Sequence, residues 1–214
     1  MSSPVESNTA VLRVQGLGFA YPGHDLFHGL NADFPAGLSL VQRGDGAGKT
    51  SLLRLLAGDC AAQAGCVTLN GVDAVRDAAR YRAQVFWRDP RAPWPERLTP
   101  QAWADELAAR YPSWSHALWQ AHAAGLGLAP HLGKPMYQLS AGSQRKVLLA
   151  AALASGAALT LLDEPVAALD KPSIAYLLQA LEAEARTPPW PGRVLVVAHY
   201  DALGELPWRR TLLL

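Results

Sequence analysis

The chain has 214 residues, which is enough for one globular domain with a substantial buried core. Hydrophobic residues make up 50% of the chain and charged residues 17%, a composition that excludes an intrinsically disordered protein. The formal net charge of +1 provides no general positive field, so nucleic acid is not expected as a partner.

The first ten residues, MSSPVESNTA, lack the charged and apolar regions of a signal peptide, so we expect a cytoplasmic protein. Two segments with approximate apolar alternation follow, VLRVQGLGFAY and LFHGLNADF. Turn-forming residues in YPGHD separate them. This pattern predicts two antiparallel strands.

A glycine-rich loop comes next. GLSLV predicts a strand, GDGAGKT a tight loop, and SLLRLLAG a helix that ends at a glycine, which is the context of a phosphate-binding loop. Backbone N–H groups of small residues can surround phosphate oxygens, while Lys49 reaches the β- and γ-phosphates and the Thr50 hydroxyl ligates Mg²⁺. The residues expected to bind nucleotide here are Gly44, Asp45, Gly46, Ala47, Gly48, Lys49, Thr50 and Ser51.

Arg43 stands where the pattern G-x-x-x-x-G-K-[ST] has its first glycine. Gly44 is available to make the turn instead, so we expect the loop to bind nucleotide with a slightly shifted entry. The alternative for this segment is a flexible glycine turn without a ligand.

Further on, Cys60 and Cys66 have no second cysteine or histidine pair at zinc-finger spacing nearby, and ordinary reduced thiols are expected.

A helical lobe is predicted at about residues 99–155. TPQAWADELAARY and SWSHALWQAHAAG have helical spacing, and LSAGSQRK precedes the apolar run VLLAAALA, which fits a helix starting near Gly142. The first turn of such a helix leaves N–H groups unpaired and attracts anions, although an ordinary capped helix start is the alternative.

The most hydrophobic segment, residues 147–162, is shorter than the ~20 residues that span a bilayer and predicts a buried helix followed by a strand. That strand, in LTLLDEP, ends in two carboxylates, and buried strands rarely end so without a cation. Asp163 is expected to hold Mg²⁺, and Glu164 is a candidate general base for the water that attacks the γ-phosphate. A turn with two solvated acids is the alternative.

The α/β alternation continues to the C-terminus. KPSIAYLLQALEAEA predicts a helix with one apolar face, and RVLVVAH predicts a strand that ends at His199. His199 could hydrogen-bond a γ-phosphate, although a lone histidine at a strand end is usually structural. A short final strand is predicted in TLLL.

The order of the phosphate loop, the helical lobe, LSAGSQ, LLDEP, AALD and VVAH resembles the nucleotide-binding subunit of ATP-binding cassette (ABC) proteins over nearly the whole chain. The resemblance implies an α/β fold of the P-loop NTPase class, with a mixed sheet core, an antiparallel β subdomain and a small helical lobe. It also implies that residues 1–214 form a single nucleotide-binding domain.

Three further assignments come from this resemblance. LSAGSQ matches the family's LSGGQ signature but differs at Ala141 and Ser143; by analogy, Ser140 and Gly142 would contact the γ-phosphate of ATP held by the other subunit of a head-to-tail dimer. Asp170 would be the D-loop aspartate at the dimer seam, and His199 the switch histidine.

Tyr21 in FAYPG resembles the aromatic residue that stacks on adenine, with a packed core tyrosine as the alternative. The family also has a glutamine that joins the Mg²⁺ site to the helical lobe, expected after AQVFW. Gln84 comes too early, so we align Asp89 of FWRDP with it as a Mg²⁺ ligand. A carboxylate would bring negative charge where an amide oxygen is usual, and a solvated turn is the alternative.

The resemblance therefore implies an ATP-binding and ATP-hydrolysing subunit of an ABC transporter that uses ATP and Mg²⁺. A second ATP-binding subunit, expected to be a second copy, and a separate membrane-spanning subunit that holds the translocation pore would be its partners. Trp103, Trp114 and Trp119 are candidates for the groove that receives the membrane partner, with ordinary packing as the alternative.

A narrower similarity is to the haem-exporter ATPase subunit of cytochrome c maturation, although exporters of peptides, lipids or drugs fit equally. Two other classes stay open. A soluble ABC ATPase usually carries two cassettes, long coiled-coil insertions or basic segments, which this sequence lacks. A regulatory module without hydrolysis is conceivable from the departures in the motifs, but the retained lysine, carboxylates and histidine argue against it.

Overall fold

The computed structural model describes residues 11–44 and 48–214. Its strands are β1 (Leu12–Tyr21), β2 (His24–Phe34), β3 (Gly37–Gln42), β4 (Ala64–Leu69), β5 (Val72–Asp73), β6 (Val85–Phe86), β7 (Leu159–Asp163), β8 (Val194–His199) and β9 (Arg210–Leu213). Its α-helices are α1 (Lys49–Leu56), α2 (Ala78–Ala83), α3 (Pro100–Arg110), α4 (His116–Gly125), α5 (Ala141–Ala154) and α6 (Lys171–Arg186). Short 3-10 helices lie at Ala129–His131 and Met136–Gln138.

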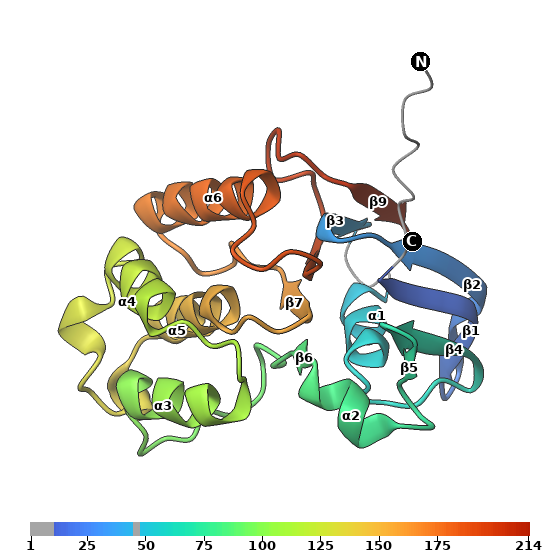
Figure 1. Cartoon of the computed structure of the whole chain (residues 1–214), viewed down its shortest axis with the longest axis horizontal. Coiled ribbons are helices and arrows are strands. Elements are labelled where there is room, and N and C mark those ends of the chain that lie inside the picture. Colours follow the sequence, from blue (N-terminus) through green and yellow to red (C-terminus); the bar gives the residue numbers. More distant parts are fainter. Residues whose placement is uncertain (1–10, 45–47) are drawn as a thin grey trace.

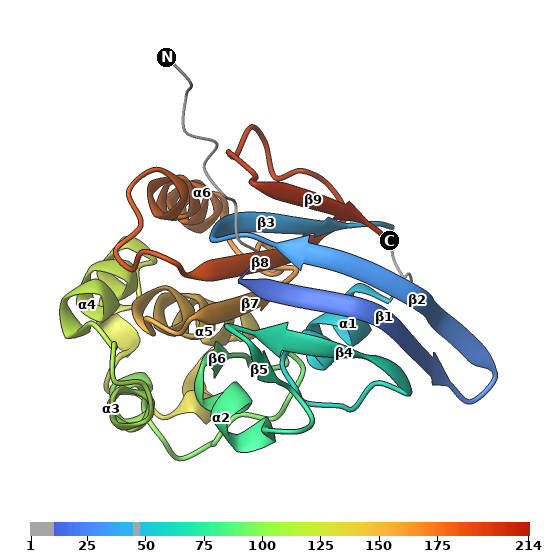
Figure 2. The same ribbon diagram turned by 45° about the vertical axis from the view of Figure 1, so that its right-hand side comes forward.

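The strands are divided between two sheets, which Figure 2 shows from the side. One sheet has the order β2-β1-β4-β5 and antiparallel pairs, and the other has the order β6-β7-β8-β3-β9 and parallel pairs. The predicted antiparallel pairing of the first two segments is confirmed, with Leu12 opposite Phe34 and Tyr21 opposite His24. The α/β class with an antiparallel β subdomain is confirmed too. The core sheet is parallel in every described pair and not mixed as expected, because the antiparallel strands form a sheet of their own.

Helices cover both faces of the parallel sheet (Figure 1). On one face, α1 lies between this sheet and the antiparallel sheet; on the other lie α5 and α6, with α3 and α4 beyond α5. Successive residues of β3 follow this division, because Leu40 packs in the cluster with the lobe helices whereas Val41 packs with the leucines of α1. Both faces of β3 are therefore buried, and GLSLV is accordingly apolar except for the buried Ser39.

Polar caps begin the long helices where the sequence predicts helix starts. Each cap side chain accepts a hydrogen bond from the backbone N–H three residues on, which contributes about 1 kcal/mol to helix stability. The cap residues are Thr99 for α3, Ser115 for α4, Ser140 for α5 and Asp170 for α6.

Across residues 11–44 and 48–214, the structure has no helix with the length and apolar character needed to cross a membrane.

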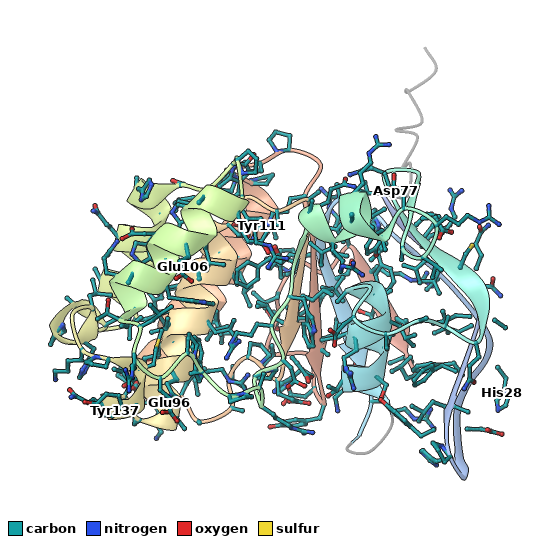
Figure 3. All side chains as sticks on the ribbon, turned by 90° about the horizontal axis from the view of Figure 1, so that it is seen from below. His28, Asp77, Glu96, Glu106, Tyr111 and Tyr137 are labelled. Carbon is teal, nitrogen blue, oxygen red and sulfur yellow. The ribbon has the colours of Figure 1, made fainter. Side chains whose placement is uncertain are left out.

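Tyr111 connects the helical side of the molecule to the parallel sheet. Its hydroxyl donates to the Val85 carbonyl at 2.9 Å, and its ring lies 5.6 Å from that of Phe86 between ring centroids. Figure 3 shows Tyr111 between the parallel sheet and α3, the helix that carries Glu106. This contact holds the end of α3 against the short edge strand β6.

The sequence analysis did not predict β4, β5 and α2. β4 pairs with β1 over a separation of 46 to 57 residues, from Gly18 opposite Ala64 to Leu12 opposite Leu69, and its alternation of apolar residues is short. Gly65 permits this pairing, because its φ of +77° suits glycine and a Cβ atom there would lie 2.3 Å from the Gln15 carbonyl oxygen. The pairing of β4 therefore depends on a close approach of two backbones, which the pattern of apolar residues in the sequence does not reveal.

A buried arginine ties four elements together. The Arg193 guanidinium, directly before β8, donates to Glu184 Oε1 of α6 at 3.0 Å and to Thr160 Oγ1 of β7 at 2.8 Å. It also donates to the carbonyl of Ala152 in α5 at 2.6 Å. Burial raises the pKa of the Glu184 carboxyl, against the opposing charge of Arg193. Every charge in this cluster thus has a partner, which buried charges require.

We expect Arg193→Met to lower the free energy of unfolding by about 3–5 kcal/mol, because it leaves Glu184 buried without its cation. Urea denaturation monitored by circular dichroism measures this change. The double variant Arg193→Met/Glu184→Leu should recover part of the loss. The matched control is Arg186→Ala, which removes an exposed ion pair with Glu182 and should cost under about 0.5 kcal/mol. Equal losses for the two single arginine variants would contradict the proposed role of the buried cluster.

Candidate functional site

The side chains with the clearest chemistry surround a cavity of about 250 Å³ where α1 begins and β7 ends. Phosphate-loop residues and the two strand-end carboxylates lie on its wall together. The lining residues are Tyr21, His24, Leu26, Gly48, Lys49, Thr50, Ser51, Arg91, Asp163 and Glu164. Asp45, Gly46 and Ala47, which the sequence predicts to bind nucleotide, lie outside the described residues.

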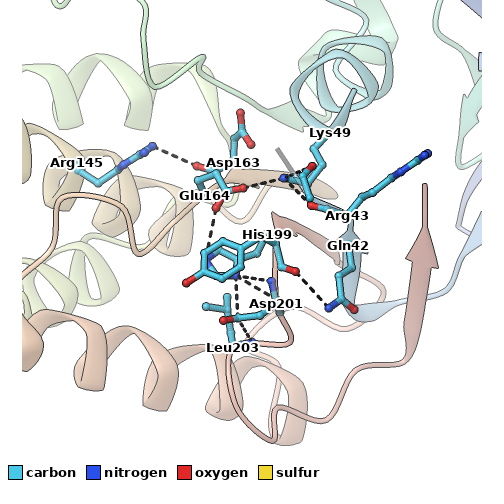
Figure 4. Close-up of polar contacts among 11 residues, drawn as sticks. Gln42, Arg43, Lys49, Arg145, Asp163, Glu164, His199, Asp201 and Leu203 are labelled. Carbon is cyan, nitrogen blue, oxygen red and sulfur yellow. Dashed lines mark hydrogen bonds and ion pairs between the residues drawn. The ribbon is translucent and has the colours of Figure 1, made fainter. Parts of the chain in front are cut away.

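Lys49 connects the two sides of the cavity. Its Nζ atom donates to the carbonyls of Arg43 at 2.8 Å and Gly44 at 3.3 Å, and it forms an ion pair with Glu164 Oε1 at 3.1 Å (Figure 4). Gly48 directly before it has a φ of +90°, a left-handed conformation that favours glycine at the start of α1. Position 43 therefore contributes its carbonyl to this arrangement, a group that every residue type has.

Asp163 lies against the first turn of α1. The Thr50 hydroxyl donates to its Oδ2 at 2.6 Å, and the side chain is only 7% exposed. Burial raises the pKa of the Asp163 carboxyl, although the hydrogen bond from Thr50 and the charges of Arg145 and Arg91 oppose this. Its other oxygen, Oδ1, is buried without a hydrogen-bond partner among the described residues. An unsatisfied carboxylate oxygen beside a hydroxyl is a donor set that suits a hard divalent cation.

Glu164 occupies a strained position at the end of β7. Its φ of +43° is in the left-handed region, which is uncommon for residues other than glycine. Its Oε2 lies 3.4 Å from Nε2 of His199, which is 1% exposed. The other imidazole nitrogen, Nδ1, lies 2.9 Å from Asp201 Oδ1, so this aspartate orients the ring toward Glu164 (Figure 4).

Tyr21 lies at the mouth of the cavity. It is 39% exposed, its ring makes an edge contact with Phe19 at 5.0 Å, and its hydroxyl accepts from Ser51 Oγ at 3.3 Å. The side chain is therefore outside the core and on the wall of the cavity.

Ser140, Gly142 and Asp170 do not line this cavity. Ser140 is exposed at the start of α5, where its hydroxyl accepts from the Ser143 N–H at 3.1 Å. A Cβ atom on Gly142 would lie 2.6 Å from the Ala168 carbonyl oxygen, so this close approach requires glycine. Asp170 accepts from Lys146 Nζ at 2.6 Å, and this contact lowers the pKa of the aspartate. The LSAGSQ and AALD segments are thus joined to each other, apart from the phosphate loop of their own chain.

Asp89 is also absent from the cavity wall. It lines a separate hollow of about 410 Å³, together with Trp103, and its Oδ1 accepts from the Arg91 N–H at 2.8 Å. The described residues contain no group of three or more histidines, cysteines or carboxylates that could hold a metal ion. The role of Asp89 as a Mg²⁺ ligand stays a prediction.

The tryptophans of the helical side differ in exposure. Trp119 is 1% exposed and its Nε1 donates to Gln101 at 3.2 Å, so it stabilises the lobe from inside. Trp114 is partly buried beside it, with ring centroids 6.1 Å apart. Among these three, only Trp103 lines the 410 Å³ hollow.

Sequence reasoning missed three residues of the cavity. His24 and Leu26 follow Tyr21 across a tight turn, so their positions were predictable once Tyr21 was placed near a nucleotide. Arg91 lies two residues beyond Asp89, in a segment without a regular secondary structure. Its approach to the cavity depends on the path of that loop.

Comparisons with known proteins agree with this geometry. The sequence profile of the ABC transporter family matches residues 27–167. The chain is 33% identical to the cytochrome c biogenesis ATP-binding export protein CcmA of Pseudomonas fluorescens, over 97% of this chain and 94% of that protein. It is also 33% identical to the nickel import ATP-binding protein NikO of Rhodobacter capsulatus, over 90% of this chain and 80% of that protein.

Among solved structures, one similar fold is an ATP-binding cassette described as a dimer in a post-hydrolysis state with bound ADP and Pi. It superposes with a TM-score of 0.70 at 18% identity, over 89% of this chain and 88% of that chain. The family match and the near full-length relatives extend over the phosphate loop, the lobe and the strand-end carboxylates. The chain therefore belongs to the ABC transporter family, as an ATPase subunit that couples ATP hydrolysis to transport.

Proposed function

We propose that this subunit binds ATP in the 250 Å³ cavity, with the phosphates at the start of α1 and the adenine toward Tyr21. The observation that carries this proposal is the convergence of Lys49, Thr50, Asp163 and Glu164 on one small volume. Phosphates at a helix N-terminus are favoured by unpaired N–H groups and the helix dipole. Gly44, Gly48 and Ser51, together with Asp45, Gly46 and Ala47, are proposed to complete the loop around them.

Thr50 and Asp163 are the residues proposed to hold Mg²⁺. The support is the buried Asp163 Oδ1, which has no hydrogen-bond partner among residues 11–44 and 48–214. When bound, the ion neutralises charge on the β- and γ-phosphates. Asp89, which the resemblance aligns with the family's glutamine, lines the separate 410 Å³ hollow and not this cavity.

Glu164 is the proposed general base, and His199 the side chain that contacts the γ-phosphate. Glu164 lies beside both Lys49 and His199, so its carboxylate is in position to accept a proton from water near the γ-phosphate. The ion pair with Lys49 occupies one carboxylate oxygen.

A second copy of this chain is the proposed partner for the signature segment. Ser140 and Gly142 lie outside the cavity of their own chain, and Ser140 is exposed at the start of an α-helix of suitable length for anion binding. The similar cassette described as a dimer supports this arrangement. In such a head-to-tail dimer, Asp170 would lie at the seam.

The proposed membrane-facing surface is the 410 Å³ hollow between the lobe and the sheet. Trp103 lines it, and so do three arginines and two aspartates, namely Arg54, Arg88, Arg110, Asp59 and Asp89. The indole and the excess of positive charge suit an amphipathic segment with acidic residues. We also propose that residues 1–214 act as one domain, with a lobe at 99–155, on the cytoplasmic face of the membrane. Because the relatives include CcmA, export in cytochrome c biogenesis is the transport step proposed for this chain.

The first test concerns Arg43. We expect Arg43→Gly to change the ATP dissociation constant by less than tenfold, because position 43 contributes a carbonyl that glycine retains. Isothermal titration calorimetry measures this, with Lys49→Ala as the variant that should lose binding. If Arg43→Gly bound ATP more than tenfold tighter, the arginine would be impairing the loop.

The second test concerns the base. Glu164→Gln should lower the ATP turnover number by about 10²–10⁴-fold while ATP binding persists, because an amide cannot accept the proton. An ATP-bound dimer should accumulate in size-exclusion chromatography. Glu106→Gln, an exposed carboxylate on α3, is the matched control and should leave turnover unchanged. Normal turnover in Glu164→Gln would exclude this base.

The third test concerns the membrane partner. The full chain purified from gently solubilised native membranes should carry a multi-spanning membrane protein in stoichiometric amount, identified by mass spectrometry. We expect Arg110→Glu to reduce this recovery severalfold, because it reverses a charge on the hollow, whereas Arg186→Glu on α6 should not. Equal recovery with Arg110→Glu and with the wild-type chain would contradict this hollow as the docking surface.

A further inference from the structure

The loop after β6 is held in shape by contacts within itself. Nη2 of Arg88 donates to the carbonyls of Pro93 at 2.8 Å and Ala92 at 3.2 Å. The guanidinium also lies over the Trp94 ring, 4.3 Å from its centroid. A loop closed on itself in this way presents its central residues in a fixed direction.

Asp89 shapes the centre of that loop. Its Oδ1 accepts from the Arg91 N–H at 2.8 Å, and its carbonyl accepts from the Ala92 N–H at 3.0 Å. A side-chain acceptor two residues before the donor forms an Asx-turn, which directs the chain sharply. The residue that this turn presents is Arg91.

Arg91 reaches the same cavity as the phosphate loop, on the wall that includes Asp163 and Glu164. Its side chain is exposed, and the structure assigns that side chain no hydrogen bond or ion pair within residues 11–44 and 48–214. Its charge nevertheless acts on the pKa of Asp163, which burial raises and Arg91 lowers. The guanidinium thus lies on the carboxylate side of the cavity, with its donors available to a ligand.

A further cation in this part of the cavity would complement the phosphates. Asp163 and Glu164 add negative charge, which the Mg²⁺ proposed at Asp163 and the nearby Arg145 would offset in part, and Lys49 is shared between Glu164 and the carbonyls of Arg43 and Gly44. A planar guanidinium can make paired hydrogen bonds to phosphate oxygens and stays charged at all relevant pH values.

We propose that Arg91 binds the γ-phosphate of ATP held by its own chain, and that Asp89 is a positioning residue for it. The inference rests on the proposed ATP site and adds a contact that distinguishes ATP from ADP. Because contacts within the loop fix its shape, Arg91 reaches the cavity without contacts from a second subunit.

The test compares MgATP and MgADP affinities of Arg91→Ala, Arg91→Lys and the wild-type chain by isothermal titration calorimetry. Arg91→Ala should weaken ATP binding at least tenfold and ADP binding less than threefold, because ADP lacks the γ-phosphate. Arg91→Lys should recover part of the ATP affinity, since it keeps the charge. Arg97→Ala, an exposed arginine nearby that does not line the cavity, should change neither affinity.

Two results would overturn the inference and leave the ATP site intact. One is unchanged ATP affinity in Arg91→Ala while Lys49→Ala abolishes binding. The other is an equal loss of affinity for ATP and for ADP, which would show that the guanidinium contacts the base, the ribose or the α- or β-phosphate. If neither Arg91→Ala nor Lys49→Ala weakened nucleotide binding, the proposed site itself would be wrong.

The positioning role has its own test. Asp89→Asn retains the acceptor for the Arg91 N–H and should keep the wild-type ratio of ATP to ADP affinity, whereas Asp89→Ala should lower that ratio at least fivefold. If Asp89→Asn lowered the ratio of ATP to ADP affinity as much as Asp89→Ala, the carboxylate charge would matter and not the turn. That result would overturn the positioning role of Asp89.

Discussion

The adjacency of three parallel strands is the constraint on which the site depends. β8 pairs with β3 on one side and β7 on the other, so Gln42 lies opposite His199 and Asp163 opposite Ala198. In a parallel sheet, the carboxyl ends of all strands meet at one edge, where ligands bind. The phosphate loop, the two carboxylates and the histidine therefore converge without any irregularity in the sheet.

Buried charged groups have different partners at the two ends of these strands. At the amino end of β8, Arg193 is fully enclosed and satisfied by a carboxylate, a hydroxyl and carbonyls, which stabilises the packing of α5 and α6. At the carboxyl end, the buried oxygen Asp163 Oδ1 has no hydrogen-bond partner within the described residues, and Glu164 has a positive φ. A fully paired cluster stabilises the fold, whereas the unsatisfied and strained groups lie at the edge that is proposed to bind ATP.

The loop at residues 88–94 lies where three hollows meet. Arg91 lines the nucleotide cavity, and Asp89 lines the hollow proposed for the membrane partner. Pro90 and Trp94 line a third hollow beside Ala141 at the start of the signature helix α5. One short segment held by its own hydrogen bonds therefore lines the proposed nucleotide cavity, the hollow proposed for the membrane partner and the hollow beside α5.

The sequence by itself determined the features that depend on local pattern. Apolar alternation, glycine spacing and cap residues predicted β1, β2, β3, α1 and most later elements, and the phosphate loop predicted the placement of Lys49 and Thr50. Only the tertiary structure decided that Lys49 pairs with Glu164, that Trp119 is internal, and that β4 joins β1 through the close approach at Gly65. It also decided that Arg91 reaches the cavity. These contacts join residues far apart in the chain or depend on the path of a loop, and no periodicity records them.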